Sequence, residues 1–404
     1  MAALLASARA RAEEFEEEHG DNDNDHLEEG SDSEVEHDQT APGYKKESSR
    51  RAFDKVFKQV VDAADVVLYV LDARDPEGTR SKEVERAIMA AEGGEKRLIL
   101  VLNKIDLIPP AVLKGWLTYL RRYFPTIPLK ASNGAPNAQS FDHKSLTVAG
   151  TSATLLKALK SFAQSKKLMR SVTVGVIGYP NVGKSSVINA LTGRLGGSQH
   201  ACPTGAEAGV TTSLREVKLD KKLKLLDSPG IVFPKAKGET KASKAEAHAR
   251  LVLLHAIPPK QIVDPIPAVT LLLQRFSTSQ VLLDKLFDVY KLPPFVNTGI
   301  DTLTKNFLIE VARKRGRLGK GGVPNLDSAA VAVIMDWRDG RIQGWIDPPV
   351  SMGTKNASLG IKSETVISAE PDQKEVVKEW MTEFSLEGFN DEQDEEVPEI
   401  EMQD

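Results

Sequence analysis

The sequence predicts an α/β domain, a mostly parallel sheet with helices on both faces, followed by a C-terminal helical domain. Short apolar runs alternate with helix-like stretches through the first half of the chain, which is typical of parallel strands buried on both faces. Polar motifs directly follow several of these runs, at the strand ends where α/β sheets bind ligands. Beyond about residue 235 the apolar residues recur at helical spacing instead.

The composition is that of a globular protein with room for two domains, because 41% of its 404 residues are hydrophobic. No apolar run approaches the roughly 20 residues of a membrane-spanning helix, and no signal-peptide pattern is visible, so no membrane partner is expected. The single cysteine, Cys202, excludes an internal disulfide. We interpret Cys202 as a small residue in a mobile loop rather than as a catalytic thiol.

The net charge of −4 hides a strong asymmetry. Residues 13–38 contain 14 Asp/Glu and residues 387–404 contain 9, with no Lys or Arg in either run. Residues 39–386 carry a net charge of +17, from 51 Lys/Arg and 34 Asp/Glu. Such a basic core favours a polyanionic partner, and RNA is the usual one. The acidic segments are expected to be disordered, and a sharper interpretation is that they shield the core from non-specific RNA.

The elements of the α/β domain are predicted from apolar runs and the turn residues between them. The first strand, 66–71, ends in the turn Asp72-Ala73-Arg74-Asp75-Pro76, and a helix to about Glu92 precedes the second strand, 97–102. The remaining elements are a helix from Pro110 to about Tyr123, a strand at 127–130, a surface excursion at 133–150, a helix at 152–168, and strands at 172–178, 214–219 and 222–226.

A helical domain is predicted over residues 250–346, with Pro265 and Pro267 marking a kinked or extended approach to it. Two apolar faces at helical spacing support it, one of Leu303, Phe307, Leu308 and Val311 and one of Leu326, Ala330, Val333, Ile334 and Trp337. The predicted domains are an acidic segment 1–50, the α/β domain 51–235, a basic helical domain 236–349 and an acidic tail 350–404.

The run Gly178-Tyr179-Pro180-Asn181-Val182-Gly183-Lys184-Ser185 matches the phosphate-loop pattern GxxxxGK[ST], between a predicted strand and a predicted helix. Its glycines let the backbone curl so that its N–H groups face phosphate oxygens, and Asn181, Val182 and Gly183 count among the nucleotide-binding residues. Lys184 is expected to bridge the β- and γ-phosphates, Ser185 to bind Mg²⁺ and Ser186 to face the α-phosphate. The alternative is a glycine-rich turn that binds nothing.

Asn103-Lys104-Ile105-Asp106 matches NKxD, the guanine-reading motif, and follows a predicted buried strand. The carboxylate of Asp106 is expected to accept two hydrogen bonds from guanine, and adenine would leave that buried acceptor unpaired. The aliphatic part of Lys104 would pack over the base. In Lys130-Ala131-Ser132, Ala131 and Ser132 resemble the short loop whose backbone N–H meets guanine O6.

Asp227-Ser228-Pro229-Gly230 matches DxxG, which places Asp227 near Mg²⁺ and the N–H of Gly230 at the γ-phosphate. The segment Gly209-Val210-Thr211-Thr212 resembles switch I, whose threonine completes the Mg²⁺ shell. Either Thr211 or Thr212 fits that role. The loop 194–212 is expected to become ordered with nucleotide.

Ile231 stands where related enzymes keep a glutamine that orients water, so intrinsic hydrolysis is expected to be slow. Asn181 is the candidate replacement, because an asparagine at this loop position helps hold a K⁺ ion beside the phosphates in related GTPases. A local loop cap is the alternative. The expected ligands are therefore GTP or GDP, Mg²⁺ and K⁺, with Asn181, Lys184, Thr211, Thr212 and Gly230 as candidate catalytic residues.

The order of the motifs is unusual, because NKxD precedes the phosphate loop and DxxG comes third. With Asp72-Ala73-Arg74-Asp75-Pro76, the phosphate loop and the run 315–324, this order resembles the circularly permuted GTPases of the YlqF/YawG family. Within it the chain is similar to nucleostemin-type nucleolar GTPases and their fungal counterparts, from about Phe53 to Pro349. One departure is the N-terminus, which turns acidic where such proteins usually have a long basic segment.

The resemblance implies a circularly permuted Ras-like GTPase domain with a helical C-terminal domain, in a nuclear and nucleolar factor for large (60S) ribosomal subunit precursors. The expected partners are pre-ribosomal RNA and other assembly factors. Two alternatives are a GTP-binding scaffold whose hydrolysis is dispensable and a GTPase tied to RNA modification. Because DxxG leads directly into the helical domain, we expect nucleotide state to bias that domain's position. Candidate RNA contacts are Lys235, Lys237, Lys241 and Lys244, and the favoured cluster of Arg313, Lys314, Arg315, Arg317 and Lys320.

Overall fold

The computed structural model describes residues 55–91, 96–143, 146–165, 170–196, 202, 214–230, 241–293 and 299–349. Both switch I threonines, Thr211 and Thr212, and also Ile231 lie outside the described residues. The same holds for the acidic segments at both ends, for Lys235 and Lys237, and for the side chains of Lys241 and Lys244.

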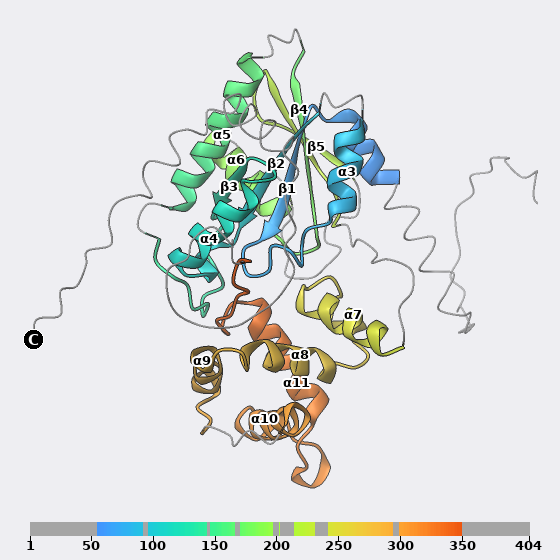
Figure 1. Cartoon of the computed structure of the whole chain (residues 1–404), viewed down its shortest axis with the longest axis vertical. Helices are drawn as coiled ribbons and strands as arrows, with labels where there is room; N and C mark the ends of the chain where they lie inside the picture. Colours follow the sequence, from blue (N-terminus) through green and yellow to red (C-terminus); the bar gives the residue numbers. More distant parts are fainter. Residues whose placement is uncertain are drawn as a thin grey trace, which may run out of the picture. The chain divides into compact units, whose positions relative to one another are not determined.

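Six strands form one sheet in the order β3-β2-β1-β4-β6-β5 (Figure 1). Five of them run parallel, and the edge strand β5 pairs with β6 in the antiparallel direction. The predicted fold class, a mostly parallel sheet with helices on both faces and a helical C-terminal part, is confirmed. The strands are β1 (Val66–Asp72), β2 (Arg97–Asn103), β3 (Thr126–Leu129), β4 (Val172–Gly178), β5 (Arg215–Lys218) and β6 (Leu223–Asp227).

Every residue of β1 is buried, because the strand lies between β2 and β4 and is covered on both faces. The helix at residues 55–63 and α3 (Lys82–Ala90) lie on one side of the sheet, and α5 (Val148–Ser165) and α6 (Lys184–Arg194) lie on the other. α4 (Pro110–Leu120) packs beside β3. This apolar sandwich fixes the ends of the strands.

The helix α5 (Val148–Ser165) begins earlier than the predicted 152–168, and residues 166–168 lie outside the described part of the chain. Its start is set by Thr147, whose hydroxyl oxygen accepts a hydrogen bond from the backbone N–H of Gly150 at 3.0 Å. A threonine in this place satisfies one of the unpaired N–H groups of the first helical turn. The first residues of α5, from Val148 to Gly150, therefore belong to the stretch 133–150 that was predicted as a surface excursion.

The C-terminal half contains five described α-helices around a second apolar core, separate from the core of the sheet. The predicted face of α10 is buried. The predicted face of α11 is also buried, except for Leu326, which is half-buried. Pro265 and Pro267 lie at the start of α8, where proline suits the first turn, so they begin a helix rather than kink the chain. The helices are α7 (Lys241–Leu253), α8 (Ile266–Phe276), α9 (Gln280–Tyr290), α10 (Ile300–Lys314) and α11 (Leu326–Arg338).

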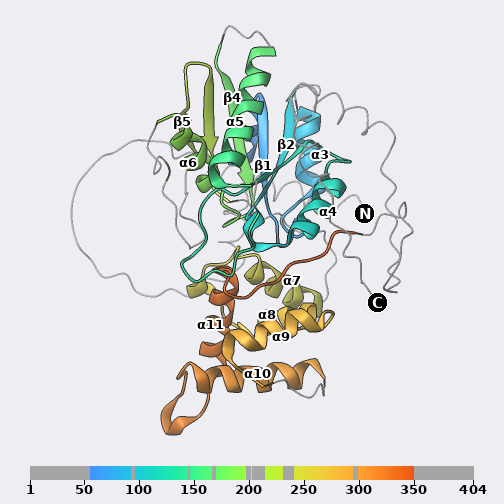
Figure 2. The ribbon, with the colours of Figure 1, turned by 90° about the vertical axis from the view of Figure 1, so that its left-hand side faces the viewer.

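Beyond α11 the chain returns to the sheet (Figure 2). The N–H of Ile346 donates to the main-chain oxygen of Arg74 at 2.9 Å, and the indole N–H of Trp116 in α4 donates to the oxygen of Ile346 at 2.8 Å. Trp345 packs against both apolar cores. Residues near 345 thus contact the α/β part, and the domain boundaries at 235 and 349 stay predictions.

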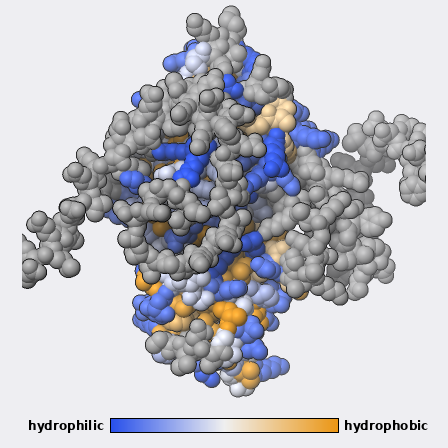
Figure 3. Space-filling view, in the orientation of Figure 1, coloured by the Kyte–Doolittle hydropathy of each residue, from blue (hydrophilic) through white to orange (hydrophobic). Residues whose placement is uncertain are grey.

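Large apolar side chains that are exposed all belong to the helical region in the described part of the chain. They are Val263, Val281, Leu318 and Val323, and on the face shown in Figure 3 the apolar residues gather over the same region. Within the described residues no helix is both long and apolar enough to cross a membrane.

Candidate guanine nucleotide site

The predicted motifs meet at one edge of the sheet, where five parallel strands end. The NKxD motif continues β2, the phosphate loop continues β4, and DxxG begins at the last residue of β6. Ala131 follows shortly after β3. Chain order does not affect this meeting, because neighbours in the sheet are set by pairing rather than by sequence.

Asn103 joins three of these segments. Its side-chain N–H₂ donates to the main-chain oxygen of Val182 in the phosphate loop at 2.8 Å, and its side-chain oxygen accepts the N–H of Ala131 at 3.2 Å. Gly183 adopts φ +98, and a side chain there would collide with the amide of Asn103. The sequence predicted Asn103 as one of the nucleotide-binding residues, and the structure places it as the bridge between the NKxD motif, the phosphate-loop motif and Ala131.

Asp106 is buried in the short 3-10 helix Ile105–Leu107 that follows Lys104, and its main-chain oxygen accepts the N–H of Phe141 at 2.7 Å. No described residue hydrogen-bonds to its carboxylate, so both oxygens stay open to a ligand with paired donors. Lys104 adopts a left-handed conformation with φ 62, and its ammonium group lies 2.8 Å from Asp72. Ala131 is buried and Ser132 is exposed.

The phosphate loop ends at Gly183, directly before the first turn of α6, a position where backbone N–H groups and the helix dipole favour an anion. The ammonium of Lys184 donates to the main-chain oxygens of Gly178 at 3.2 Å and Tyr179 at 2.9 Å. Burial lowers the pKa of Lys184 to about 8, against the opposing pull of Asp227. A buried cation whose charge is disfavoured in this way suits a polyanionic ligand. Ser186 is half-buried in the same turn.

Of the residues predicted to bind Mg²⁺, Ser185 and Asp227 are described, and both fit that ion. The hydroxyl of Ser185 donates to Oδ2 of Asp227 at 3.0 Å, and Asp227 is fully buried. Oδ1 of Asp227 has no hydrogen-bond partner in the described part of the chain. Burial raises the pKa of the Asp227 carboxyl, with Ser185 and Cys202 opposing it. A buried carboxylate with an unpaired oxygen beside a hydroxyl is the oxygen-rich setting that Mg²⁺ prefers.

Gly230 lies against the phosphate loop so closely that a methyl group would not fit. A Cβ atom there would be 2.6 Å from Cα of Pro180. DxxG and the phosphate loop are therefore packed backbone to backbone.

Cys202, which the sequence suggested to be a small residue in a mobile loop, is buried. Its N–H donates to the side-chain oxygen of Asn189 at 2.8 Å, and the amide N–H₂ of Asn189 donates back to its main-chain oxygen at 2.9 Å. Burial raises the pKa of the thiol to about 12, which makes a reactive thiolate unfavourable near neutral pH.

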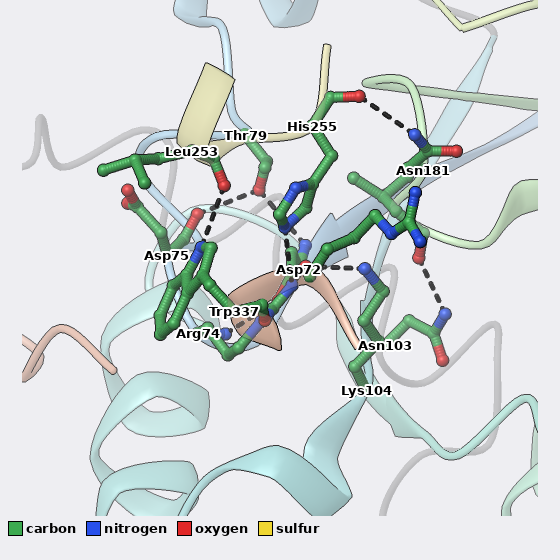
Figure 4. Close-up of polar contacts among 12 residues, drawn as sticks. Asp72, Arg74, Asp75, Thr79, Asn103, Lys104, Asn181, Leu253, His255 and Trp337 are labelled. Atoms are coloured by element: carbon green, nitrogen blue, oxygen red, sulfur yellow. Dashed lines mark hydrogen bonds and ion pairs between the residues drawn. The ribbon is translucent and has the colours of Figure 1, made fainter. Parts of the chain in front are cut away.

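Asn181 contacts the helical region. It adopts φ 58, and its side-chain N–H₂ donates to the main-chain oxygen of His255 at 2.9 Å (Figure 4). His255 ends α7 in a left-handed conformation with φ 60. This contact is neither of the two roles predicted for Asn181 from the sequence, although it leaves the side-chain oxygen free for either.

A buried cluster around Asp72 was not predicted as functional, although its sequence supported the family resemblance. Arg74 forms a bidentate pair with Asp72 at 3.1 and 2.9 Å and also donates to the main-chain oxygen of Trp337 in α11 at 2.8 Å. Burial opposes ionisation, but the charges of Arg74 and Lys104 hold the pKa of Asp72 well below its usual range. Asp75 lies 3.4 Å from Arg275 of α8. The turn after β1 thus joins the edge of the sheet at which the motifs meet to the helices α8 and α11.

Three of the five residues of the predicted RNA-binding cluster lie in an exposed hairpin after α10, residues 315–324, closed by a bridge between Leu318 and Pro324, whereas Arg313 and Lys314 lie in the last turn of α10. Two of the cluster's five cations are paired, Arg313 with Glu310 at 2.6 Å and Arg315 with the buried Asp336 at 2.7 Å. The other three, Lys314, Arg317 and Lys320, are exposed and have no ion-pair partner among the described residues.

Comparison with known proteins agrees with this geometry. A family model described as "50S ribosome-binding GTPase" matches residues 173–284, which include the phosphate loop and DxxG but begin after NKxD. The GTPase grn1 of Schizosaccharomyces pombe is 52% identical over 85% of this chain and 70% of its own length. The chain belongs to the same family as grn1. The resemblance to fungal nucleolar GTPases is therefore confirmed.

Other members of the family are similarly close. The nuclear GTP-binding protein NUG1 of Saccharomyces cerevisiae is 53% identical over 85% of this chain and 66% of its own length. The guanine nucleotide-binding protein-like NSN1 of Arabidopsis thaliana is 40% identical over 75% and 50%. The chain thus spans between half and about two thirds of these relatives. GNP-bound YlqF from T. maritima is 21% identical, with a TM-score of 0.45, over 75% of this chain and 98% of that one.

Proposed function

We propose that this protein binds and hydrolyses GTP and acts as an assembly factor for the large ribosomal subunit, on pre-ribosomal RNA in the nucleolus. The bridge made by Asn103 carries the nucleotide part of this proposal, because it holds a guanine-reading loop against a phosphate loop. The open carboxylate of Asp106 favours guanine over adenine, because adenine lacks the matching pair of donors. The family supports the same conclusion, since its members are named as GTPases and GTP-binding proteins.

The residues at the strand ends divide the work of phosphate binding. Lys184 would exchange its two main-chain acceptors for phosphate oxygens, and the N–H groups at the start of α6 would surround them. Ser185 and Asp227 would hold Mg²⁺, which supplies charge neutralisation on the phosphates. Gly230 would offer its N–H to the terminal phosphate, because it packs closely on Pro180 of the phosphate loop.

K⁺ is the proposed source of the extra positive charge that an arginine supplies in other GTPases. Asn181 fits this ion because its N–H₂ is already used by His255, so the amide offers its oxygen, the atom type that K⁺ prefers. The position after DxxG is Ile231, which cannot orient water, and this supports slow hydrolysis without the ion.

RNA binding is proposed for the exposed hairpin 315–324 and the basic core around it. Lys314, Arg317 and Lys320 are exposed and unpaired in the described structure, so they can neutralise phosphates without breaking an internal ion pair. Nucleotide state would reach this surface through the segment after Gly230, which joins DxxG to α7. The acidic run 13–38 would limit non-specific contacts, and its deletion should raise them.

Two other functions remain as competitors. A scaffold that binds GTP without needing hydrolysis would tolerate loss of catalysis, whereas a switch would not. A GTPase tied to RNA modification would need a second site that the motifs do not indicate. RNA crosslinks mapped on the protein in cells test the proposal: crosslinks at the hairpin to large-subunit precursor RNA support it, and their absence from that RNA contradicts it.

A further inference from the structure

The side-chain orientation of Asn181 is set from the helical region rather than from the α/β part. Its N–H₂ donates to the main-chain oxygen of His255 at 2.9 Å, across 74 positions of sequence. A carbonyl oxygen only accepts, so the amide must present nitrogen to His255 and oxygen to the other side. In Figure 4 the side-chain oxygen of Asn181 points away from His255.

His255 holds its carbonyl in place through the way α7 ends. The N–H of His255 donates to the oxygen of Val252 at 3.0 Å, and the N–H of Ala256 donates to the oxygen of Leu251 at 3.0 Å. This pair of bonds is the Schellman pattern, in which the residue at His255 is left-handed and usually glycine. A histidine with φ 60 is therefore a disfavoured choice for helix termination alone.

The contacts of the imidazole explain why a histidine occupies this left-handed position. It is buried, and Nε2 lies 3.4 Å from the guanidinium of Arg74. Arginine only donates, so Nε2 must accept, and the ring is neutral. Arg74 is held in turn by Asp72 and by the main-chain oxygen of Trp337. The ring thereby anchors the end of α7 to a buried ion pair beside the guanine-reading Lys104.

Residues in the left-handed conformation gather around the contact between Asn181 and His255. Four non-glycine residues have positive φ in the described part of the chain, and three of them are Lys104, Asn181 and His255. Disfavoured backbone held by its surroundings is typical of functional sites. The fourth, Lys291, ends α9 with the same pattern of bonds but takes no part in this network, so it provides a matched control.

We propose that the main-chain carbonyl of His255 is the positioning group for Asn181, which makes the helical region part of the hydrolytic site. By accepting the asparagine N–H₂, it leaves the side-chain oxygen as the ligand for K⁺. Movement of α7 would release the amide and weaken the K⁺ site. This inference rests on the proposed K⁺-dependent hydrolysis of GTP.

The test compares substitutions that differ in their tolerance of the left-handed conformation. His255→Asn and His255→Val both remove the imidazole, but asparagine adopts this conformation readily and β-branched valine does not. Lys291→Val imposes the same backbone penalty at the end of α9. Affinity for a non-hydrolysable GTP analogue is measured in KCl and in NaCl at equal ionic strength, together with the single-turnover rate for GTP and the affinity for GDP in NaCl.

We expect wild type and Lys291→Val to bind the analogue at least about threefold more tightly in KCl, and His255→Asn to retain most of that preference. His255→Val should lose it, with GDP affinity in NaCl within about twofold of wild type. In an Asn181→Ala background, His255→Val should have no further effect on the K⁺ preference. If His255→Val does not fold, His255→Ala makes the comparison with a milder penalty.

The outcomes separate the inference from the proposed function. A K⁺ preference that persists in His255→Val, or that Lys291→Val loses equally, overturns the positioning role and leaves K⁺-dependent hydrolysis intact. Equal behaviour of wild type in both salts overturns K⁺ dependence itself, and the positioning role with it.

Discussion

The side-chain amide of Asn103 donates a hydrogen bond to the main-chain oxygen of Val182 at 2.8 Å, so the NKxD motif is tied directly to the phosphate-loop motif. The other half of the same amide accepts the N–H of Ala131. Three segments that are separated in sequence are joined through a single buried residue. Base recognition and phosphate binding are therefore expected to respond together to changes around this bridge.

Nucleotide choice should depend on Asp106. Asp106→Asn turns one acceptor into a donor that faces the donors of guanine, so affinity for GTP and GDP should fall by about 100-fold or more. Xanthine nucleotides, which carry an acceptor at that edge, should bind better than in wild type. Titration with fluorescent nucleotides checks this, with Asp142→Asn in the exposed part of the neighbouring loop as the control. Unchanged GTP affinity in Asp106→Asn would contradict the assignment of the base pocket.

Gly230 should not tolerate a side chain. In Gly230→Ala the new methyl group would meet the backbone of Pro180, with Cβ only 2.6 Å from its Cα, so DxxG or the phosphate loop must move. We expect affinity for GTP to fall at least about tenfold, since loops packed at backbone distance cannot relax cheaply. Gly319→Ala is the control, because its Cβ would make an ordinary contact at 3.6 Å. Equal nucleotide affinities in the two variants would show that this close packing is not needed.

His255 should make the folded state sensitive to mild acid. Burial first, and then the nearby charges of Arg74 and Lys104, hold its pKa well below 6.5, with Arg338 adding to this and Asp72 opposing it. The unfolded chain takes up this proton below pH 6.5 and the folded chain does not, so stability falls as pH falls through that range. Between pH 7.5 and 5.5 the loss from this residue is on the order of 1 kcal/mol.

Urea unfolding at both pH values checks the sign and the size. His255→Asn should lose less stability between pH 7.5 and 5.5 than wild type does, whereas substitution of the exposed His248 should not change the difference. An identical pH dependence in wild type and His255→Asn would mean that the imidazole is not held neutral in the fold.

The strands and the nucleotide motifs could be predicted from the sequence because their signals are local. Continuous apolar runs bounded by turns indicated β1 and β2, and the residues that follow a buried strand must lie at its carboxyl end. The positions of NKxD, GxxxxGKS and DxxG at the strand ends could therefore be predicted together with their chemistry. The start of α5 was missed because the cap at Thr147 lies inside a polar stretch that also looks like a loop.

The connection to the helices could not be predicted, because it joins residues that are far apart in the chain. Arg74 reaches Trp337 across 263 positions, and no local pattern records that pairing. His255 contributes a main-chain oxygen, which every residue has, so its identity carried no signal. The family resemblance of the turn Asp72-Ala73-Arg74-Asp75-Pro76 was the one available clue, and it pointed to the segment without indicating its partner.

RNA binding should depend on the unpaired cations of the hairpin 315–324. Reversal of both Arg317 and Lys320 to glutamate should lower the slope of log affinity against log salt by about 0.7–0.9 for each phosphate that the protein no longer neutralises. Affinity for GTP should stay unchanged. Arg315 is a poor target, because a carboxylate there would face the buried Asp336 and destabilise the fold.

The measurement is RNA binding across a salt series, with Lys260→Glu as an exposed control in the same region. A slope that does not change on reversal of Arg317 and Lys320 would make the hairpin an ordinary solvated surface. RNA contact would then have to be sought near Lys241 and Lys244.

The central claim is that the site hydrolyses GTP with K⁺ held through Asn181. The most direct measurement is single-turnover GTP hydrolysis in KCl and in NaCl at equal ionic strength, for wild type, Asn181→Ala and Lys184→Ala. Wild type should be at least about tenfold faster in KCl, Asn181→Ala should be slow in both salts while still binding GTP, and Lys184→Ala should lose both binding and turnover. Equal rates in the two salts for wild type and Asn181→Ala alike would contradict the account.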